Sequence, residues 1–478
     1  MYIGLDLGTS GLKALLIDDE QRAVAEATAP LSVSRPHPSW SEQDPADWVA
    51  AAQTALRGLA QKTSLSGVRG IGLSGQQHGA TILDSAHKVL RPAILWNDTR
   101  AGAEARQLDE MPSFREITGN ICFAGFTAPK LIWAANHEPD VFAQVALVLL
   151  PKDYLRLWLT GDAVSEPSDA SGTGWLDVQK RTWSPTLLEA CRMGEEHMPS
   201  LVEGSEVSGG LRQAVADEFG LPAGIPVAGG GGDNASAAVG MGVVEEGPAF
   251  VSLGTSGVLF ATTPKFSPMA ETAVHSFCHA IPRMWHQMGV ILAATDALNW
   301  LAKLAQSDAV SITADLGPLQ APGRPLFVPY LGGERTPCND PDARASFIGL
   351  AHETDRTAAA RAVLEGVTFA VKDSADALAA CGTKLDRVIA VGGGSKSRYW
   401  LEAIATALGV PVDVPGAGDY GAAFGAARLG AIAAGRDLSF ITTPEIAATV
   451  DPDPSLQDAF AQAQQRYRAT YQALKDLS

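Results

Sequence analysis

The stretch Leu5-Asp6-Leu7-Gly8-Thr9-Ser10-Gly11 contains a pentapeptide, Leu7–Gly11, that recurs unchanged at Leu253–Gly257. Strand-forming residues precede each copy, and another apolar run follows it. A strand, a glycine-rich turn and a second strand predict a β-hairpin whose turn offers free backbone N–H groups. Two identical turns about half a chain apart predict two similar domains, each with a cradle the size of a phosphate group.

The length and composition agree with two domains. A chain of 478 residues is too long for one ordinary hydrophobic core, and an apolar content of 46% is enough to form two. We place the boundary within residues 243–249, which gives an N-terminal domain of residues 1–245 and a C-terminal domain of residues 246–478. Strands alternate with helices in both parts, so we predict an α/β fold.

The charge and the cysteines restrict the class of protein. A net charge of −17 disfavours a nucleic-acid or anionic-membrane surface, although local N–H groups and a metal ion still permit a phosphate ligand. The five cysteines are scattered and fit reduced thiols. The N-terminus is not typical of a signal peptide, and the apolar runs are too short for a membrane span. We therefore expect a cytoplasmic protein without nucleic-acid or membrane partners.

Regular elements are predicted from periodicity and capping signals. Asp44 and Pro45 predict a helix over residues 46–59, with Asp44 as its cap. Further helices are predicted over residues 235–242, 357–380, 421–434 and 456–477, and one from the glycines at 392–394 through residue 408. Further strands are predicted over residues 68–74, 93–96, 225–228, 327–330 and 387–391.

Asp6 and Asp233 are the candidate catalytic acids. Asp6 lies within an apolar strand, where a carboxylate is costly unless it is paired or binds a metal. We assign it, directly or through water, to the Mg²⁺ that accompanies a nucleotide, although an acid satisfied by nearby backbone N–H groups is the alternative. Asp233 follows four glycines, Gly229–Gly232, that let a substrate approach the backbone. It could accept a hydroxyl proton during phosphoryl transfer and contact the metal, although a capping role at the helix start is the simpler alternative.

Polar clusters at two strand ends are candidates for sugar recognition. Gln77 and His78 follow the strand predicted over residues 68–74. Trp96 ends the strand predicted over residues 93–96, and Asp98 follows it. Amide, imidazole and carboxylate groups beside an aromatic ring are typical of carbohydrate contacts. A structural role for each side chain is the alternative.

Phosphates would be held mainly by backbone N–H groups, hydroxyls and metal. The chain has neither a GxxxxGK[ST] motif nor the glycine-rich, HRD and DFG elements of protein kinases. The residues Gly392–Ser395 could bind a nucleotide at a helix start, although a packing turn is the alternative.

Taken in order, the Asp6 hairpin, Gly230–Asn234, the second hairpin and Gly392–Gly394 resemble the FGGY family of carbohydrate kinases over essentially the whole chain. The stretch Phe126–Trp133 is similar to that family's first signature. The resemblance implies two ribonuclease-H-like domains, of the type found in hexokinase and actin, that close over a central cleft for ATP and sugar.

Within the family, the segments Ser34–Asp44, Ile94–Asp98, Leu149–Leu155 and Gly333–Pro337 are most similar to those of members that phosphorylate D-xylulose. Gln77 departs from this pattern, since bacterial members of that type often have Met there.

The resemblance also implies roles for individual residues. Asp233 would be the general base, and Asp6 would organise Mg²⁺ and the phosphates of ATP. The remaining roles form two sets: a sugar pocket of Gln77, His78, Trp96, Asp98 and Asn234, and a nucleotide site of Thr9, Ser10, Gly254, Thr255, Gly393 and Gly394.

Two alternatives remain open from the sequence. One is a related kinase of ribulose, gluconate, glycerol or another polyol, which would share every ATP motif. The other is an actin- or chaperone-like ATPase without a sugar substrate. By resemblance alone, a homodimer is expected.

Overall fold

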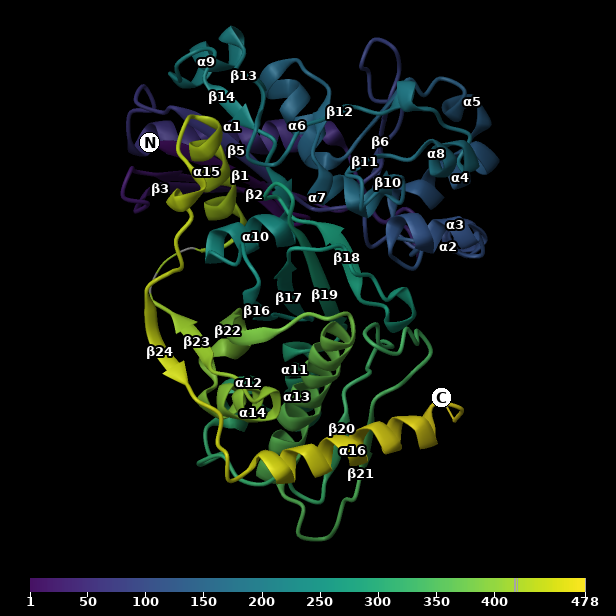
Figure 1. Ribbon diagram of the computed structural model, residues 1–478, viewed down its shortest axis with the longest axis vertical. Coiled ribbons are helices and arrows are strands. Elements are labelled where there is room, and N and C mark those ends of the chain that lie inside the picture. The colour runs from purple at the N-terminus through teal and green to yellow at the C-terminus, as the bar shows by residue number, and fades with distance from the viewer. Residues whose placement is uncertain (417, 419, 478) are drawn as a thin grey trace.

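The computed structural model describes residues 1–416, 418 and 420–477, and it folds into two lobes (Figure 1). Each lobe is built on a seven-stranded sheet, with strand order β13-β14-β5-β1-β2-β3 in the first, where β15 also pairs with β5, and β18-β19-β17-β16-β22-β23-β24 in the second. Both sheets combine parallel and antiparallel strands and carry helices. The predicted α/β class is therefore confirmed.

The two predicted hairpins are present at equivalent places in the two sheets. Strands β1 (Tyr2–Leu7) and β2 (Gly11–Ile17) are antiparallel, as are β16 (Gly247–Leu253) and β17 (Gly257–Thr263). On its other side β1 pairs in parallel with β5 (Gly70–Gly75), and β16 pairs in parallel with β22 (Leu385–Val391). The repeated pentapeptide therefore occupies the same structural position in both sheets.

The helix α15 (Ala422–Ala433) packs on the first sheet although it lies near the end of the chain. Its backbone approaches the strands so closely that a Cβ atom added at Gly4 would lie 1.8 Å from the Ala423 oxygen, and one added at Gly72 would lie 1.7 Å from the Ala426 oxygen. Only glycine permits this approach. The helix α1 (Pro45–Lys62) covers the other face of this sheet (Figure 1).

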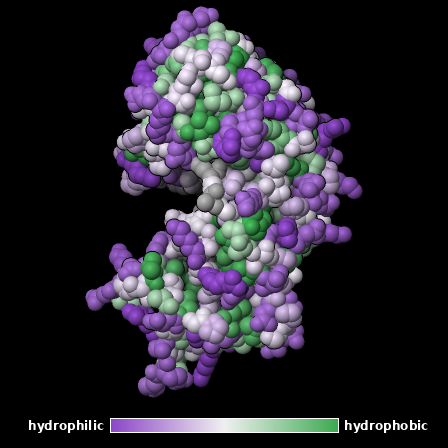
Figure 2. Space-filling model, turned by 90° about the vertical axis from the view of Figure 1, so that its left-hand side faces the viewer, coloured by the Kyte–Doolittle hydropathy of each residue, from purple (hydrophilic) through white to green (hydrophobic). Residues whose placement is uncertain are grey.

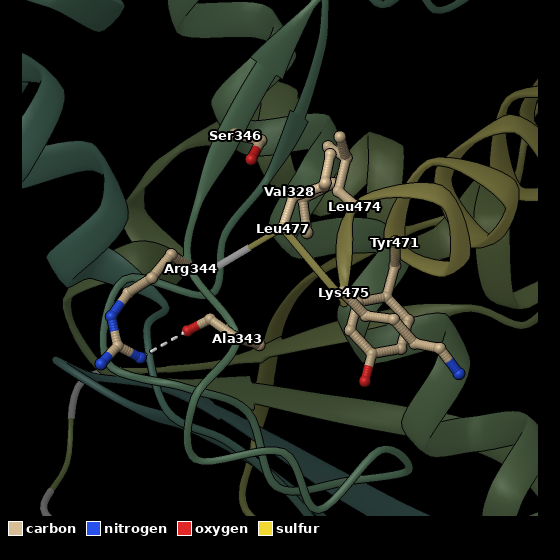
Figure 3. Close-up of a pocket in the computed structure, with 8 residues that line it drawn as sticks. All are labelled: Val328, Ala343, Arg344, Ser346, Tyr471, Leu474, Lys475 and Leu477. Carbon is tan, nitrogen blue, oxygen red and sulfur yellow. Dashed lines mark hydrogen bonds between the residues drawn. The ribbon is translucent and has the colours of Figure 1, made fainter.

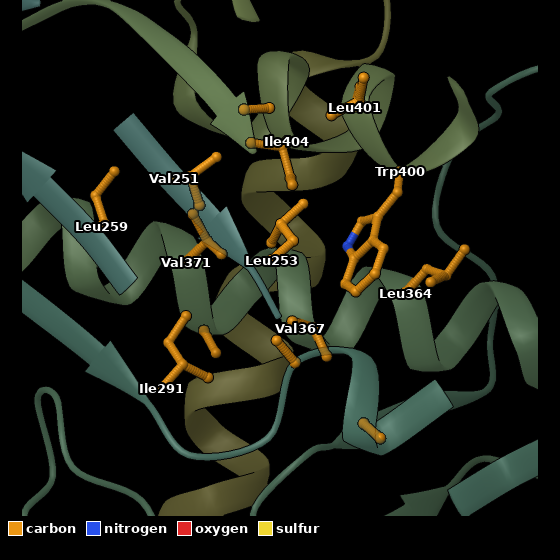
Figure 4. Close-up of a cluster of buried hydrophobic side chains, with 14 of the residues drawn as sticks. Val251, Leu253, Leu259, Ile291, Leu364, Val367, Val371, Trp400, Leu401 and Ile404 are labelled. Atoms are coloured by element: carbon orange, nitrogen blue, oxygen red, sulfur yellow. The ribbon is translucent and has the colours of Figure 1, made fainter. Parts of the chain in front are cut away.

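The second lobe has its core between the sheet and the helices α11 (Thr295–Leu304), α13 (Arg356–Ala380) and α14 (Arg398–Leu408). Figure 4 shows Leu253 and Val251 of β16 pointing toward Trp400 and neighbouring aliphatic side chains. Residues 250, 260 and 389, on the opposite face, join a cluster with Met241 and Val243 that links the two lobes. The hairpin that ends β16 is therefore fixed by packing on both faces.

The predicted helices are confirmed with small shifts at their ends. Asp44 caps α1 by accepting a hydrogen bond of 2.9 Å from the Ala46 N–H, and Pro45 is its first residue. The helix predicted from residues 392–394 differs, because a 3₁₀ turn η4 (Gly393–Lys396) comes first and Ser397 caps a separate helix α14. Gly392 has φ of +89°, outside the helical region, which breaks the helix there.

The remaining strands of the two large sheets are β3 (Ala23–Pro30), β13 (Val207–Gly210), β14 (Pro226–Ala228), β15 (Gly231–Gly232), β18 (His275–Cys278), β19 (Trp285–Ile291), β23 (Val412–Pro415) and β24 (Ile446–Val450). Short strands outside them are β4 (Glu42–Gln43), β6 (Thr81–Leu83), β7 (Ala93–Ile94), β8 (Leu147–Leu149), β9 (Val164–Ser165), β10 (Leu176–Asp177), β11 (Thr182–Trp183), β12 (Ser200–Leu201), β20 (Leu326–Val328) and β21 (Ser346–Ile348).

The remaining α-helices are α2 (Gly102–Asp109), α3 (Pro112–Thr118), α4 (Thr127–His137), α5 (Pro139–Phe142), α6 (Pro151–Thr160), α7 (Pro167–Ala170), α8 (Pro185–Ala190), α9 (Gln213–Phe219), α10 (Asp233–Met241), α12 (Ala309–Thr313) and α16 (Gln457–Leu474). The described helices include none with the length and apolar character needed to cross a membrane. All five cysteines are free thiols.

Candidate functional site

Asp6 points to the side of the sheet that carries α15, because of the two-residue period of a strand. Ile3, Leu5 and Leu7 pack with α1, so Gly4 and Asp6 face the other way. Gly4 lies beneath α15, whereas Asp6 is nearer the end of β1 that leads into the turn. Its Oδ1 accepts a hydrogen bond of 2.8 Å from the buried Ser74 hydroxyl on the neighbouring strand β5.

Asp233 is the first residue of α10, and its charge interacts with that of Asp6. Burial, and next the Asp6 carboxylate, raise the pKa of Asp233 to about 7. Its Oδ1 accepts hydrogen bonds from the Asn234 backbone N–H at 2.8 Å and from the Asn234 side-chain amide at 3.0 Å. Asp233 accepts one backbone N–H of the first helical turn, as a capping residue would, but the cap position itself is occupied by Gly232. The capping alternative is therefore met only in part. The two candidate acids are close enough for their charges to interact.

The glycine loop before Asp233 is held by buried polar groups that our reading of the sequence missed. The Arg156 guanidinium donates hydrogen bonds of 2.5 Å to the Ala228 and Gly229 carbonyl oxygens. The Gly232 N–H donates to the Ser168 hydroxyl oxygen at 3.1 Å. The loop therefore has few alternative conformations, and this fixes the direction of the Asp233 side chain.

Arg156 belongs to a fully buried group of five charged residues. Lys152 lies 2.8 Å from Asp153, 3.4 Å from Glu166 and 3.1 Å from Asp169. Three acids face two bases in this group, and burial raises the pKa of Asp169 well above its usual range. In the sequence, the only sign of this group was the position of Lys152-Asp153 within a family-like segment.

Gln77 and His78 reach the same site from the end of β5. A Cβ atom at Gly232 would lie 2.7 Å from the Gln77 side-chain nitrogen, so Gln77 is packed against the loop before Asp233. His78 Nδ1 lies 2.6 Å from the Gly172 carbonyl oxygen and must be the donor, since a carbonyl only accepts. Burial lowers the pKa of His78 to about 3. The neutral ring thus keeps Nε2 as an acceptor.

Trp96 and Asp98 have different surroundings. Trp96 is 48% exposed, and its indole N–H donates a hydrogen bond of 2.9 Å to the Thr9 hydroxyl. Asp98 is buried, and both of its oxygens accept hydrogen bonds, from Arg100 and from the Ser41 N–H. In this geometry Asp98 has no free acceptor for a sugar hydroxyl. It supports the loop that carries Trp96, a positioning role in place of the predicted contact.

The turns of both hairpins have their carbonyl groups directed into the protein. In the first turn, the Thr9 oxygen accepts from the Gln43 side chain at 2.7 Å and the Ser10 oxygen from the Leu31 N–H at 2.9 Å. In the second, the Gly254 and Thr255 oxygens accept from N–H groups at the start of α11. The turns can therefore direct their N–H groups outward, as a phosphate cradle requires.

A pocket of about 430 Å³ lies between the two lobes. Asn234 and Ala237 of α10 line one side, and Gly392, Ser395 and Pro415 of the second lobe line another. Figure 2 shows the deep indentation between the lobes from the side. The pocket has the size and mixed lining expected for a small-molecule ligand.

The two glycines predicted to contact the nucleotide differ in position. Gly393 is exposed, and a Cβ atom there would meet nothing within 4 Å. Gly394 is buried, and a Cβ atom there would lie 2.7 Å from both Leu253 and Trp400. Gly394 thus permits close packing beneath the second hairpin, whereas the pocket itself is lined by Gly392 and Ser395.

Another hollow lies on the second lobe beside α16. Figure 3 shows its lining, which includes Val328, Arg344, Tyr471 and Leu474. Its volume is about 220 Å³, and it contains none of the predicted site residues. The tail helix α16 packs on the second lobe, and this hollow is formed at its C-terminal end.

The chain is similar to known proteins over most of its length. The N- and C-terminal domain models of the FGGY family of carbohydrate kinases match residues 1–240 and 249–434. The xylulose kinase of Escherichia coli (strain K12) is 48% identical over 483 residues, which cover 100% of both chains.

Two solved structures are also similar over nearly the whole chain. A structure described as a xyloylose kinase from Brucella ovis is 57% identical, with a TM-score of 0.98 over 100% of both chains. A gluconate kinase from Lactobacillus acidophilus is 26% identical, with a TM-score of 0.92 over 99% of this chain and 97% of that one. The protein therefore belongs to the FGGY family of carbohydrate kinases, as its duplicated hairpins and the acids beside them indicated.

Proposed function

We propose that this carbohydrate kinase transfers the γ-phosphate of ATP to D-xylulose and forms D-xylulose 5-phosphate. The observation that carries the proposal is the pair Asp6 and Asp233 beside an inter-lobe pocket, with neutral His78 and Gln77 on the sugar side. The name shared by relatives that are similar over their full length supports the choice of sugar.

Asp233 is the general base of the proposed reaction. Its Oδ1 is held by Asn234, which directs the carboxylate and leaves Oδ2 to face the attacking hydroxyl. As the sugar oxygen bonds to the γ-phosphorus and the bond to the leaving ADP oxygen breaks, the hydroxyl proton passes to Asp233. A pKa of about 7 is close to the ambient pH, where a base both accepts and releases a proton readily.

Mg²⁺ is expected with the nucleotide, and the residues present fit it. Asp6 and Asp233 supply hard carboxylate oxygens, the donors that Mg²⁺ prefers, and their mutual repulsion is relieved by a cation. We assign Asp6 to the metal, directly or through water, and allow Asp233 a contact. Bound Mg²⁺ would neutralise charge on the β- and γ-phosphates and lower the pKa of Asp233.

Most of the other predicted site residues keep their assignments as parts of this proposal, whereas Asp98 and Gly394 have supporting roles. His78 Nε2 accepts from a sugar hydroxyl, Gln77 and Asn234 supply amide contacts, and Trp96 borders the sugar. The turns at residues 9–10 and 254–255 enclose the phosphates, and Gly393 lies beside the adenosine. Closure of the lobes would exclude water, which otherwise competes as the acceptor.

A kinase of gluconate, ribulose or glycerol is the second candidate, favoured only by Gln77, whose amide could hydrogen-bond where a Met could not. Membership of a carbohydrate kinase family argues against an ATPase without a sugar substrate. We also propose a cytoplasmic homodimer, which light scattering coupled to gel filtration would test.

A sugar panel tests the substrate. ADP release is measured with Mg-ATP and D-xylulose, D-ribulose, gluconate, glycerol or no sugar. We expect D-xylulose to give the highest kcat/KM, at least about tenfold above the others, which corresponds to about 1.4 kcal/mol of discrimination. Equal or greater rates with another sugar would overturn the choice of D-xylulose, and a rate independent of sugar would overturn the kinase assignment.

A further inference from the structure

A chain of side-chain hydrogen bonds lies beneath the turn of the first hairpin, residues 8–10, which we call the first phosphate turn. It involves two glutamines that have no role in the proposed reaction. Gln43 and Gln76 are each 2% exposed. Gln76 Nε2 donates to Gln43 Oε1 at 2.9 Å, and Trp48 Nε1 donates to that same oxygen at 2.9 Å. At the other end, the Thr9 hydroxyl lies 2.8 Å from Gln76 Oε1. The chain links the core beneath α1 to the turn.

The direction of every hydrogen bond in this chain is fixed by groups that can act in only one way. The Trp48 indole N–H only donates, so the Gln43 atom that faces it is the oxygen. The Thr9 and Ser32 carbonyls only accept, so the Gln43 atom that faces them, at 2.7 and 3.2 Å, is the nitrogen. These two arguments agree on the orientation of the Gln43 amide.

The same logic fixes the Thr9 hydroxyl. Gln76 uses its nitrogen toward Gln43, so its oxygen faces Thr9, and the hydroxyl must donate to it. The Trp96 indole N–H donates to the hydroxyl oxygen from the other side. The Thr9 hydroxyl proton is therefore committed to Gln76 and is not available to a phosphate, whereas the exposed Ser10 has no such constraint.

The carbonyl oxygens of the two phosphate turns are held by different kinds of donor. A turn that cradles phosphate must keep its carbonyl oxygens away from the anion. In the second turn, backbone N–H groups at the start of α11 hold the Gly254 and Thr255 oxygens. In the first, strand β3 follows the hairpin, and the Gln43 side chain holds the Thr9 oxygen instead. Gln43 thus substitutes for a helix start.

We propose that Gln43 and Gln76 are positioning residues for ATP: their amides fix the Thr9 carbonyl and hydroxyl so that the first turn offers N–H groups to the phosphates. Loss of the Gln43 donor would free the Thr9 peptide to rotate and place its oxygen toward the nucleotide. The proposal rests on the proposed function for the identity of the nucleotide, but not for the identity of the sugar.

The test uses Gln43→Glu, which keeps the acceptor for Trp48 and removes the donor to Thr9, with Gln76→Met as a second variant. Gln287→Glu is the matched control. Gln287 is a buried bridging glutamine of the second sheet, whose amide donates to the Ser267 oxygen and accepts from Thr383. It reports the cost of placing a carboxylate at a buried amide site far from the first turn.

Two measurements are made on the full-length enzyme: ADP affinity by calorimetry without sugar, and the KM values for ATP and sugar. We expect both first-lobe variants to weaken ADP binding and raise the KM for ATP about tenfold or more, with the KM for sugar changed less than about threefold. Gln287→Glu should leave all three nearly unchanged, even if it lowers the unfolding temperature as much as Gln43→Glu does.

ADP binding and KM for ATP equal to those of the wild type in either folded first-lobe variant would overturn the proposal, as would an equal rise in the two KM values. Its failure is distinguishable from failure of the proposed function. If no sugar supports turnover but ADP binding is weakened as expected, the function is wrong and the positioning role stands.

Discussion

Replacing Asp233 with Asn should lower kcat by about 10²–10⁴ and yet stabilise the folded protein at neutral and alkaline pH. The reason is that burial and the Asp6 carboxylate disfavour the charged form, which raises the pKa of Asp233 from 3.8 to about 7. An amide of the same size carries no charge at any of these pH values. The variant thus avoids a cost that the wild type bears for its function.

The magnitude follows from the difference between the two pKa values. About three pH units at 1.36 kcal/mol each give about 4 kcal/mol as an upper value, and partial access to the cleft reduces it to on the order of 2–4 kcal/mol. Below pH 4 both the folded and the unfolded wild-type chain hold the proton. Between pH 4 and 7 the unfolded chain has released it and the folded chain has not, so wild-type stability falls relative to the variant. Above pH 7 the difference is constant.

Urea unfolding at pH 5 and pH 8, without nucleotide, sugar or divalent metal, measures the effect. About two of the three pH units lie between pH 5 and 7, so the advantage of Asp233→Asn should grow by about 2 kcal/mol between the two conditions. Asp458→Asn is the control, because Asp458 is an exposed acid in the first turn of another helix, α16. An advantage that is the same at both pH values, or a variant less stable at pH 8, would refute the reasoning.

Three further predictions concern the same site and its support. Asp6→Asn should remove repulsion from Asp233, lower its pKa and move the acidic limb of the kcat/KM profile to lower pH; an unmoved limb would contradict this. His78→Ala should raise the KM for sugar about tenfold and leave the KM for ATP within about twofold, and the reverse pattern in steady-state kinetics would contradict the assignment. Gly72→Ala should destabilise the fold by about 3 kcal/mol or more, because its Cβ would lie 1.7 Å from a helix oxygen. Gly332→Ala, where the added Cβ atom would meet nothing within 4 Å, should cost less than about 1 kcal/mol, and urea unfolding of both variants measures the difference.

Local signals in the sequence were sufficient to predict much of the fold. The hairpins depend on glycine-rich turns between apolar runs, and α1 on a capping Asp44 and a Pro45 at its first position, all of which act over a few residues. Asp6 could be recognised as a candidate site residue because an unpaired carboxylate within an apolar strand costs free energy. Its meeting with Asp233 could be expected from family order alone.

Contacts between distant segments were not predictable from one sequence. Gly4 and Gly72 lie within buried strands, where a glycine indicates that another part of the backbone approaches closely. The sequence does not say that this part is the helix α15, more than 300 residues away. Likewise, Gln43 and Gln76 are ordinary polar residues until the fold joins them beneath Thr9. Asp98 was predicted at the sugar, but its neighbour Arg100 satisfies it first.

The central claim is that Asp233 accepts the proton of the sugar hydroxyl during phosphoryl transfer. Its most direct test compares wild type with Asp233→Ala in steady-state kinetics with D-xylulose and Mg-ATP, together with sugar binding by calorimetry. The account predicts a kcat lower by about 10²–10⁴, the usual contribution of a general base, with sugar affinity changed by less than about tenfold. A kcat equal to that of the wild type would contradict it.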